Sequence, residues 1–293
     1  MLEGVIVKGI GGFYYIRTEQ GVYEAKARGK FRSRGLIPIV GDRVCISVTD
    51  EAEKKGSLDE ILPRKNSFIR PPVANLDRII ITFAPKDPEP NLRLVDKLTL
   101  TALAAGVSCG ICINKTELDP ERAKELAEIY KKTGFPVLLI SAKEGFGKEE
   151  LAALLKDKVT AFAGNSGVGK SSILNGLLGG EAMETGSISE KIKRGRHTTR
   201  HVELLALPFG GFAFDTPGFS TFELEGVTAQ ELAGYFPEFA AYPESCRFAG
   251  CAHISEPDCA VKEALSEGKI AMSRYESYCE LYETLKQIKE WMK

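Results

Sequence analysis

The stretch that decides the fold is Gly164–Ser172, which reads Gly-Asn-Ser-Gly-Val-Gly-Lys-Ser-Ser. It fits the phosphate-binding loop pattern G-x-x-x-x-G-K-[ST] without a mismatch. Glycines in such a loop let backbone N–H groups point inward around phosphate oxygens. Lys170 would supply positive charge at the β- and γ-phosphates, and Ser171 would offer a hydroxyl to Mg²⁺. The residues expected to touch the nucleotide here are Gly164, Asn165, Ser166, Gly167, Val168, Gly169, Lys170, Ser171 and Ser172.

The flanking sequence supports this interpretation of the loop. Lys158–Ala163 is typical of a short buried strand, and Ser171–Leu178 is typical of a helix. A strand, a glycine loop and a helix N-terminus together form an anion site from fixed dipoles. The alternative is a chance glycine-rich turn, which would not need these flanking elements. The sequence therefore predicts a nucleotide-binding protein.

Composition sets the broad class. The 293 residues are 43% hydrophobic and 27% charged, which allows two or three domains with a sizeable core. The net charge of -1 excludes a global basic field, so any RNA contact must come from local patches. No apolar run reaches the length of a membrane span, and the first residues lack a secretion signal. We expect a cytoplasmic protein without membrane contact and without disulfides.

The first 65 residues are expected to form an all-β domain, because short alternating runs are separated by glycines and polar turns. Such strands suit a small closed barrel of the OB type. A basic run follows the third expected strand and consists of Lys26, Arg28, Lys30, Arg32 and Arg34. It is either a solvated loop or a contact for nucleic-acid phosphates, and the run alone does not decide between them.

After the proline-containing stretch Leu62–Val73, strands and helices alternate. Buried strands are expected at Leu76–Ala84, Val107–Ile113 and Pro136–Ile140, with the helix Leu92–Ala105 after the first of them. This alternation predicts a doubly wound α/β domain over residues 66–223.

Two short stretches follow strand ends, where ligands bind in such sheets. They contain Asn114, Lys115, Thr116 and Glu117, and then Ser141, Ala142 and Lys143. A carboxylate at Glu117 can accept hydrogen bonds from N1–H and the 2-amino group of guanine, a donor pair that adenine lacks. A backbone N–H of the second stretch would reach the guanine carbonyl oxygen. The alternative for the first stretch is a turn at the start of a helix.

Two more stretches are expected to contact Mg²⁺ and the γ-phosphate. Asp215, at the start of Asp-Thr-Pro-Gly, would hold Mg²⁺ through water, and the Gly218 N–H would sense the γ-phosphate. Thr198 and Thr199 lie in a segment expected to act as a switch, with Thr199 completing the Mg²⁺ shell.

A residue that orients the attacking water is expected after the Asp-Thr-Pro-Gly stretch. Phe219 stands where Ras-type enzymes carry a glutamine, so another group or a partner must orient the water. His197 is the internal candidate, and a solvent-exposed or phosphate-contacting histidine is the alternative. Together with Lys170 and Thr199 it makes up the expected catalytic set.

The C-terminal residues 224–293 are expected to be mostly helical and to hold a metal. Cys246-x4-Cys251-x-His253-x5-Cys259 offers three thiolates and one imidazole, which suits tetrahedral Zn²⁺. With no further ligand in the cluster, the site is expected to be structural. Free buried thiols are the alternative.

The order of these motifs is unusual, because Asn114–Glu117 precedes the phosphate loop by about 50 residues. A barrel, a GTPase domain with this circularly permuted order, and a Cys3His module closely resemble the RsgA family, the small-subunit-dependent GTPases of bacteria. The Gly-Arg-His-Thr-Thr segment Gly195–Thr199 and Asp215–Phe219 are also family-like. Glu117 departs from the pattern, which usually has Asp, and its extra methylene should shift the carboxylate by about one C–C bond while keeping guanine selectivity.

The resemblance implies a GTPase that binds the small (30S) ribosomal subunit, assists its late maturation and hydrolyses GTP faster on it. The barrel and the zinc module would contact 16S rRNA, and the protein would act as a monomer. The competing hypothesis is an RNA-binding scaffold whose guanine-nucleotide binding is regulatory and whose turnover is negligible. An ATPase is a weaker alternative, which Asn114–Glu117 opposes.

Overall fold

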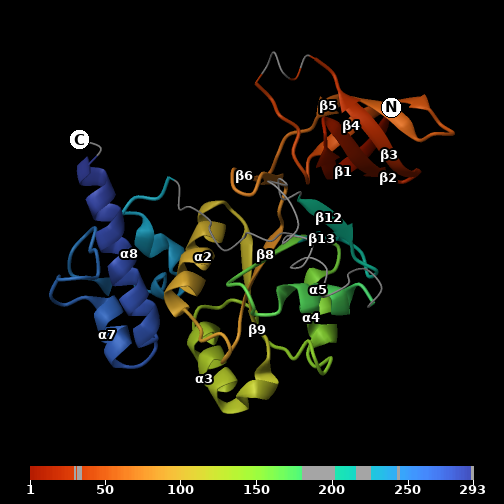
Figure 1. The fold of residues 1–293 in the computed structure, drawn as a ribbon. Helices are drawn as coiled ribbons and strands as arrows, with labels where there is room; N and C mark the ends of the chain where they lie inside the picture. The colour runs from red at the N-terminus through yellow and green to blue at the C-terminus, as the bar shows by residue number, and fades with distance from the viewer. Residues whose placement is uncertain (30, 32–34, 180–201, 216–225, 243–244, 292–293) are drawn as a thin grey trace. The chain divides into compact units, whose positions relative to one another are not determined.

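The computed structural model describes the chain except residues 30, 32–34, 180–201, 216–225, 243–244 and 292–293, and the side chains of 288–291 (Figure 1). The chain divides into two compact units, which are described separately. Unit 1 consists of Met1–Ile79, Lys148–Phe162 and Ser171–Thr221. Unit 2 consists of Ile80–Gly147, Ala163–Lys170 and Phe222–Lys293.

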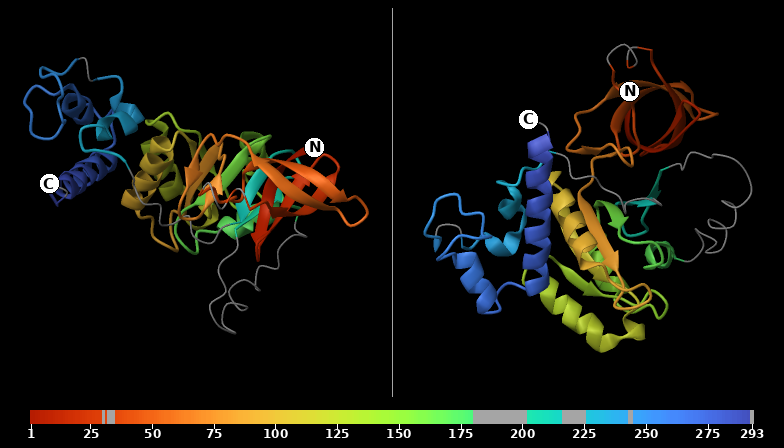
Figure 2. Two further views of the ribbon diagram at one scale, coloured as in Figure 1. Left: turned by 90° about the horizontal axis from the view of Figure 1, so that it is seen from above. Right: turned by 60° about the vertical axis from the view of Figure 1, so that its left-hand side comes forward.

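The N-terminal part of unit 1 is a five-stranded barrel. Its strands are β1 (Leu2–Ile10), β2 (Phe13–Thr18), β3 (Gly21–Ala27), β4 (Arg43–Asp50) and β5 (Lys55–Ile61). They pair in the order β1-β2-β3-β5-β4, and the pairing of β1 with β4 closes the ring, which the right-hand view of Figure 2 shows end on. Fully buried apolar side chains fill the interior, namely Ile6, Ile16, Tyr23, Ile46 and Leu58.

Strand β1 also extends beyond the barrel. A β-bulge between Ile6 and Lys8 shifts its register against β2, and Lys8 pairs antiparallel with Glu203 of β12 (Glu203–Ala206). Strand β12 is antiparallel to β13 (Phe212–Asp215). Strand β13 is parallel to β11 (Val159–Ala163). The sheet of unit 1 is therefore continuous from the barrel to the strands beside the phosphate loop.

The stretch between the barrel and β8 is more ordered than its three prolines suggest. Two short strands, β6 (Ser67–Phe68) and β7 (Val73–Ala74), pair antiparallel, and both β7 residues are fully buried. Gly41 has φ +93°, and a Cβ there would lie 2.2 Å from the Ala74 carbonyl oxygen, so only glycine fits. This close approach packs β7 against the residues that precede β4.

In unit 2, strands β10 (Val137–Leu139), β9 (Ser108–Ile113) and most of β8 (Arg78–Phe83) lie side by side. Long buried runs in β8 and β9 are typical of strands covered on both faces. Helix α2 (Leu92–Ala104) begins after Asn91, whose side chain caps the Leu94 N–H. Asp119 caps α3 (Pro120–Lys131) in the same way. The three strands and helix α2 match the elements expected from the sequence.

The C-terminal part of unit 2 is built on helices. It contains the 3₁₀ turns η2 (Leu232–Tyr235) and η3 (Pro237–Phe239) and the helices α7 (Ala260–Ser266) and α8 (Met272–Trp291). Its aromatic core packs against Leu100 of α2, and α8 runs beside α2 in both Figure 1 and the right-hand view of Figure 2. Within the described residues, no helix has the length and apolar character needed to cross a membrane.

Candidate functional site

The phosphate loop lies between β11 and helix α5 (Lys170–Leu177). Gly164 and Gly169 have φ of +135° and +90°. A Cβ at Gly164 would lie 2.0 Å from the Thr82 carbonyl oxygen, and one at Gly169 would lie 2.3 Å from Asn114 Nδ2. Both positions require glycine for conformation and for space. Close contacts with Thr82 of β8 and with Asn114 therefore explain why the motif has glycine at these two positions.

Lys170 folds over the loop that precedes it. Its ammonium donates to the carbonyl oxygens of Gly164 at 2.8 Å and Asn165 at 2.6 Å. Burial lowers the pKa of Lys170 from its ordinary value, because the charged ammonium is partly removed from water. Ser171 and Ser172 follow in the first turn of α5 and are exposed. The loop thus presents a cation and two hydroxyls at a helix N-terminus.

Asn114 joins the three stretches expected around one nucleotide. Its Nδ2 donates to the Val168 carbonyl oxygen at 2.8 Å, and its Oδ1 accepts from the Ala142 N–H at 3.0 Å. The side chain is buried, and Asn114 itself is held by an N–H bond to the Phe83 carbonyl oxygen. Residues 114, 142 and 168 are far apart in sequence, yet one amide side chain connects them.

The neighbours of Asn114 are held in a defined turn. Lys115 has φ +61° and donates through Nζ to the Asp87 carbonyl oxygen. Thr116 donates through Oγ1 to the Ile140 carbonyl oxygen at 3.2 Å. The Oε2 atom of Glu117 is buried and accepts no hydrogen bond from any described residue. A buried carboxylate oxygen in need of a donor fits the donor edge of guanine.

The Ser141–Lys143 stretch forms a closed turn. The backbones of Ser141 and Phe146 bond to each other in both directions, and Ser141 Oγ accepts from the Glu144 N–H at 3.2 Å. Because the Ala142 N–H already donates to Asn114, the N–H of Lys143 is the better candidate for a base contact.

Asp215, in unit 1, ends β13, directly opposite Glu203 of β12. Burial raises the pKa of Asp215, and the negative charge of Glu203 raises it further. The other residues expected at the magnesium site and the switch, His197, Thr198, Thr199 and Gly218, lie outside the described residues, as does Phe219.

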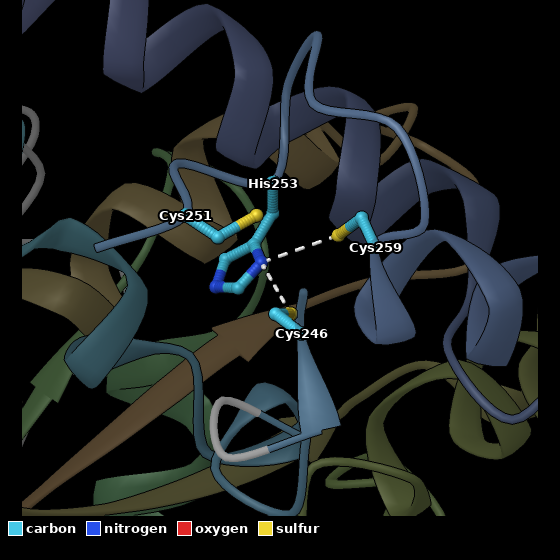
Figure 3. A group of neighbouring side chains, drawn as sticks. All are labelled: Cys246, Cys251, His253 and Cys259. Atoms are coloured by element: carbon cyan, nitrogen blue, oxygen red, sulfur yellow. Dashed lines mark hydrogen bonds between the residues drawn. The ribbon is translucent and has the colours of Figure 1, made fainter. Parts of the chain in front are cut away.

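The expected metal ligands come together in unit 2. One ligand atom from each of Cys246, Cys251, His253 and Cys259 lies within 4.8 Å of the other three. Figure 3 shows His253 Nδ1 facing the sulfurs of Cys246 and Cys259, at 3.7 and 3.3 Å. If each ligand atom lay about 2.0–2.3 Å from one tetrahedral ion, the ligand atoms would lie from one another at distances close to the 3.3 and 3.7 Å given above. The cluster therefore fits Zn²⁺.

The loop that carries these ligands is held by tyrosines of α8. The Tyr275 hydroxyl donates to the His253 carbonyl oxygen at 2.8 Å, and the Tyr278 hydroxyl donates to that of Ala252 at 2.6 Å. Burial lowers the pKa of His253, which keeps the imidazole neutral as metal ligation requires. The donor set is therefore compatible with a zinc ion, and the tyrosines of α8 hold the loop that carries it.

Comparison with known proteins identifies the family. A family model described as RsgA GTPase matches residues 61–225, and one described as RsgA N-terminal domain matches residues 3–56. The chain belongs to the RsgA GTPase family. A protein of Ruminiclostridium cellulolyticum named "Small ribosomal subunit biogenesis GTPase RsgA" is 47% identical over 99% of this chain and 96% of its own length. A protein of the same name from Caldanaerobacter subterraneus is 48% identical over 99% of this chain and 96% of its own.

Solved structures agree with the RsgA assignment. YjeQ from Thermotoga maritima matches with a TM-score of 0.83 and 37% identity over 97% of this chain and 98% of its own. YloQ, described as a circularly permuted GTPase, matches with a TM-score of 0.81 and 34% identity over 98% and 96%. The predicted family, the permuted GTPase fold with an OB-like barrel, and GTP hydrolysis are confirmed. The domain boundaries after residues 65 and 223 stay predictions.

Sequence reasoning missed two members of the site region. Glu203 and Lys8 lie 195 residues apart and form an ion pair of 3.0 Å beside Asp215. Glu203 begins a strand of only four residues, too short for a periodic signal. Its one hint in the sequence is its place shortly before the Asp-Thr-Pro-Gly stretch that starts at Asp215.

Proposed function

We propose that this chain is a GTPase that binds the small (30S) ribosomal subunit, assists its late maturation, and hydrolyses GTP to GDP and phosphate faster on the subunit. The observation that carries the nucleotide part is Asn114, whose amide connects the phosphate loop to the Ser141–Lys143 stretch. The ribosomal part rests on the names of relatives that match over nearly their whole length. The protein acts in the cytoplasm as a monomer.

Guanine is selected by two groups that the fold holds in place. Glu117 accepts from N1–H and the 2-amino group through its carboxylate, whose Oε2 atom is buried. The Lys143 N–H donates to the carbonyl oxygen of the base. Asn114 fixes both stretches relative to the phosphate loop, so that base and phosphates are bound together.

The phosphates are held by the loop N–H groups and by Lys170, which turns from the loop carbonyls to the β- and γ-phosphates. Mg²⁺ bound to the nucleotide neutralises charge on the phosphate oxygens. Ser171 and Thr199 would be its ligands, and Asp215 would hold it through water. Thr198 and the Gly218 N–H contact the γ-phosphate side, and His197 orients the attacking water.

The two flanking parts contact 16S rRNA. Lys26 and Arg28 are the described members of the basic run on the barrel. Zn²⁺ on Cys246, Cys251, His253 and Cys259 fixes the loop of the C-terminal module. Because this Zn²⁺ site is closed, it stabilises the fold and takes no part in hydrolysis.

The test is a GTPase assay with purified full-length protein, with and without small ribosomal subunits. A large rise in turnover on adding subunits supports the proposal. Equal turnover with and without subunits supports the alternative, a scaffold whose nucleotide binding is regulatory. Competition by ATP in the same assay tests guanine selectivity.

A further inference from the structure

A row of directly opposite residues crosses five strands of unit 1. In order, it consists of Glu24 on β3, Tyr15 on β2, Lys8 on β1, Glu203 on β12 and Asp215 on β13. Side chains of directly opposite residues lie on the same face of a sheet. The row therefore places polar side chains on one face from the barrel to the carboxylate expected at the magnesium site.

Contacts within the row are specific. The Tyr15 hydroxyl donates to Glu24 Oε2 at 3.0 Å, and Lys8 Nζ donates to Glu203 Oε2 at 3.0 Å. The Lys8 and Glu203 side chains are 32% and 38% exposed, so water screens their charges only in part. Lys8 is the basic member of the row. Glu24 lies on one side of it, and Glu203 and Asp215 lie on the other.

The bulge in β1 produces this arrangement. The β1–β4 pairs run from Leu2 to Val5 and close the barrel. The register against β2 shifts between Ile6 and Lys8, and the chain beyond that point pairs with β12. Bulges bend a strand and re-aim a side chain. Here the bulge brings a barrel lysine opposite the residue that neighbours Asp215.

We propose that Glu203 is a positioning residue for Asp215, and that Lys8 of the barrel sets how much negative charge Glu203 presents to the magnesium site. The proposal rests on the proposed role of Asp215 in holding Mg²⁺. Glu203 stands beside Asp215 across the ladder, where its charge adds to the attraction for a cation. Lys8 compensates that charge, so a change of charge at Lys8 alters the attraction for Mg²⁺ beside Asp215.

The test uses the full chain and two neutral variants, Lys8→Met and Glu203→Gln. The measurement is the Mg²⁺ concentration that gives half-maximal binding of a fluorescent, non-hydrolysable GTP analogue. Lys8→Met leaves Glu203 uncompensated and should lower this concentration about three- to tenfold. Glu203→Gln removes the negative charge and should raise it by a similar factor. A purely structural role would weaken binding in both variants.

Further variants sharpen the result. The double variant Lys8→Met with Glu203→Gln should return to within about twofold of the original value. The charge exchange Lys8→Glu with Glu203→Lys keeps an ion pair but places a cation beside Asp215, and it should raise the Mg²⁺ requirement most. The matched control is the exposed barrel pair Lys55 and Glu53, 3.6 Å apart, whose neutral variants should leave the requirement unchanged.

The outcomes separate this proposal from the one it rests on. If the unmodified protein binds the analogue without any dependence on Mg²⁺, the proposed magnesium site itself is wrong. If that dependence is present but Lys8→Met and Glu203→Gln shift it in the same direction, or leave it unchanged, the positioning role of Glu203 is wrong. Melting temperature and Mg²⁺-independent GDP binding identify any variant that fails to fold. If a single variant fails in this way, the charge-exchange variant decides in which direction the Mg²⁺ requirement shifts.

Discussion

Arg274 and Asp96 form an ion pair inside unit 2: Nη1 of the arginine lies 2.7 Å from Oδ1 of the aspartate, and the side chains are 1% and 0% exposed. The same guanidinium donates to Glu238 from Nε at 2.7 Å and from Nη2 at 3.2 Å. The Tyr130 hydroxyl donates to Asp96 at 2.9 Å. Burial by itself lowers the pKa of Arg274, but Asp96 and Glu238 raise it overall, so the arginine stays charged.

Arg274→Met should lower the free energy of unfolding by about 3–5 kcal/mol, because it leaves two buried carboxylates without their cation. Denaturant unfolding of the purified protein measures this change. The control is Arg93→Met, which breaks an exposed pair with Glu280 on the same two helices, 70% and 48% exposed. That variant should cost less than about 1 kcal/mol. Equal costs for both variants would contradict the importance of the buried pair.

Asn114→Ala should weaken GDP binding by at least about tenfold, because the two side-chain hydrogen bonds that fix the phosphate loop and Ser141–Lys143 are lost. Titration with a fluorescent GDP analogue measures the change. Asn66→Ala is the matched control, since Asn66 bridges the N–H and carbonyl of Leu76 in unit 1. It should lower stability and leave GDP affinity unchanged. Equal losses of affinity would show a general effect of destabilisation.

Glu117→Gln should change the preferred base from guanine to xanthine. The substitution puts an amide donor where an acceptor faced the guanine 2-amino group, and xanthine carries a carbonyl at that position. We expect GDP affinity to fall about 100-fold or more and XDP to compete at least as well as GDP. Competition titrations measure both, and Glu117→Asp serves as the charge-preserving control. If GDP affinity is unchanged in the Gln variant, Glu117 does not contact the base.

Cys259→Ser should abolish the binding of one zinc ion per chain and lower the melting temperature, since Cys259 is a proposed ligand and the residue before α7. Metal analysis and thermal unfolding measure the two effects. Cys279→Ser is the control, because Cys279 is a partly buried cysteine of α8 outside the cluster. Zinc content that survives the loss of Cys259 would overturn the assignment of this ligand.

His197→Ala should keep nucleotide affinity and lose most of the subunit-stimulated turnover, because Phe219 cannot orient the water. Single-turnover hydrolysis with subunits present measures this. His201→Ala, a histidine four residues further along, is the control and should hydrolyse GTP normally. Unchanged single-turnover hydrolysis in His197→Ala would remove His197 from the mechanism.

Elements and contacts with a local signal could be predicted from the sequence. The glycine pattern of residues 164–169 and the buried runs of β8 and β9 follow from local composition. The ligand spacing of Cys246–Cys259 needed no structure either. The place of Asn114 after a buried strand, where ligands bind in such sheets, could also be predicted, although its hydrogen bond to the Val168 carbonyl oxygen needed the structure.

Contacts between distant residues could not be predicted. Arg274 and Asp96 are 178 residues apart, and each is a charged residue in a helix that would ordinarily face water. The register of β1 against β12 depends on a bulge, which a single sequence does not reveal. Strand β5 reads Lys-Gly-Ser-Leu-Asp-Glu-Ile and shows no alternation of apolar and polar residues, so its pairing with β4 decides its structure more than its own composition does.

The bonds of Asn114 also have a consequence for synthesis of the chain. Its partner Ala142 is 28 residues downstream and its partner Val168 is 54 residues downstream. Because translation proceeds from the N-terminus, the half of the pocket for the base emerges and can fold before the half for the phosphates exists. In this protein a nascent chain cannot capture its nucleotide until the permuted loop has left the exit tunnel, the reverse of the order in which an unpermuted GTPase is made.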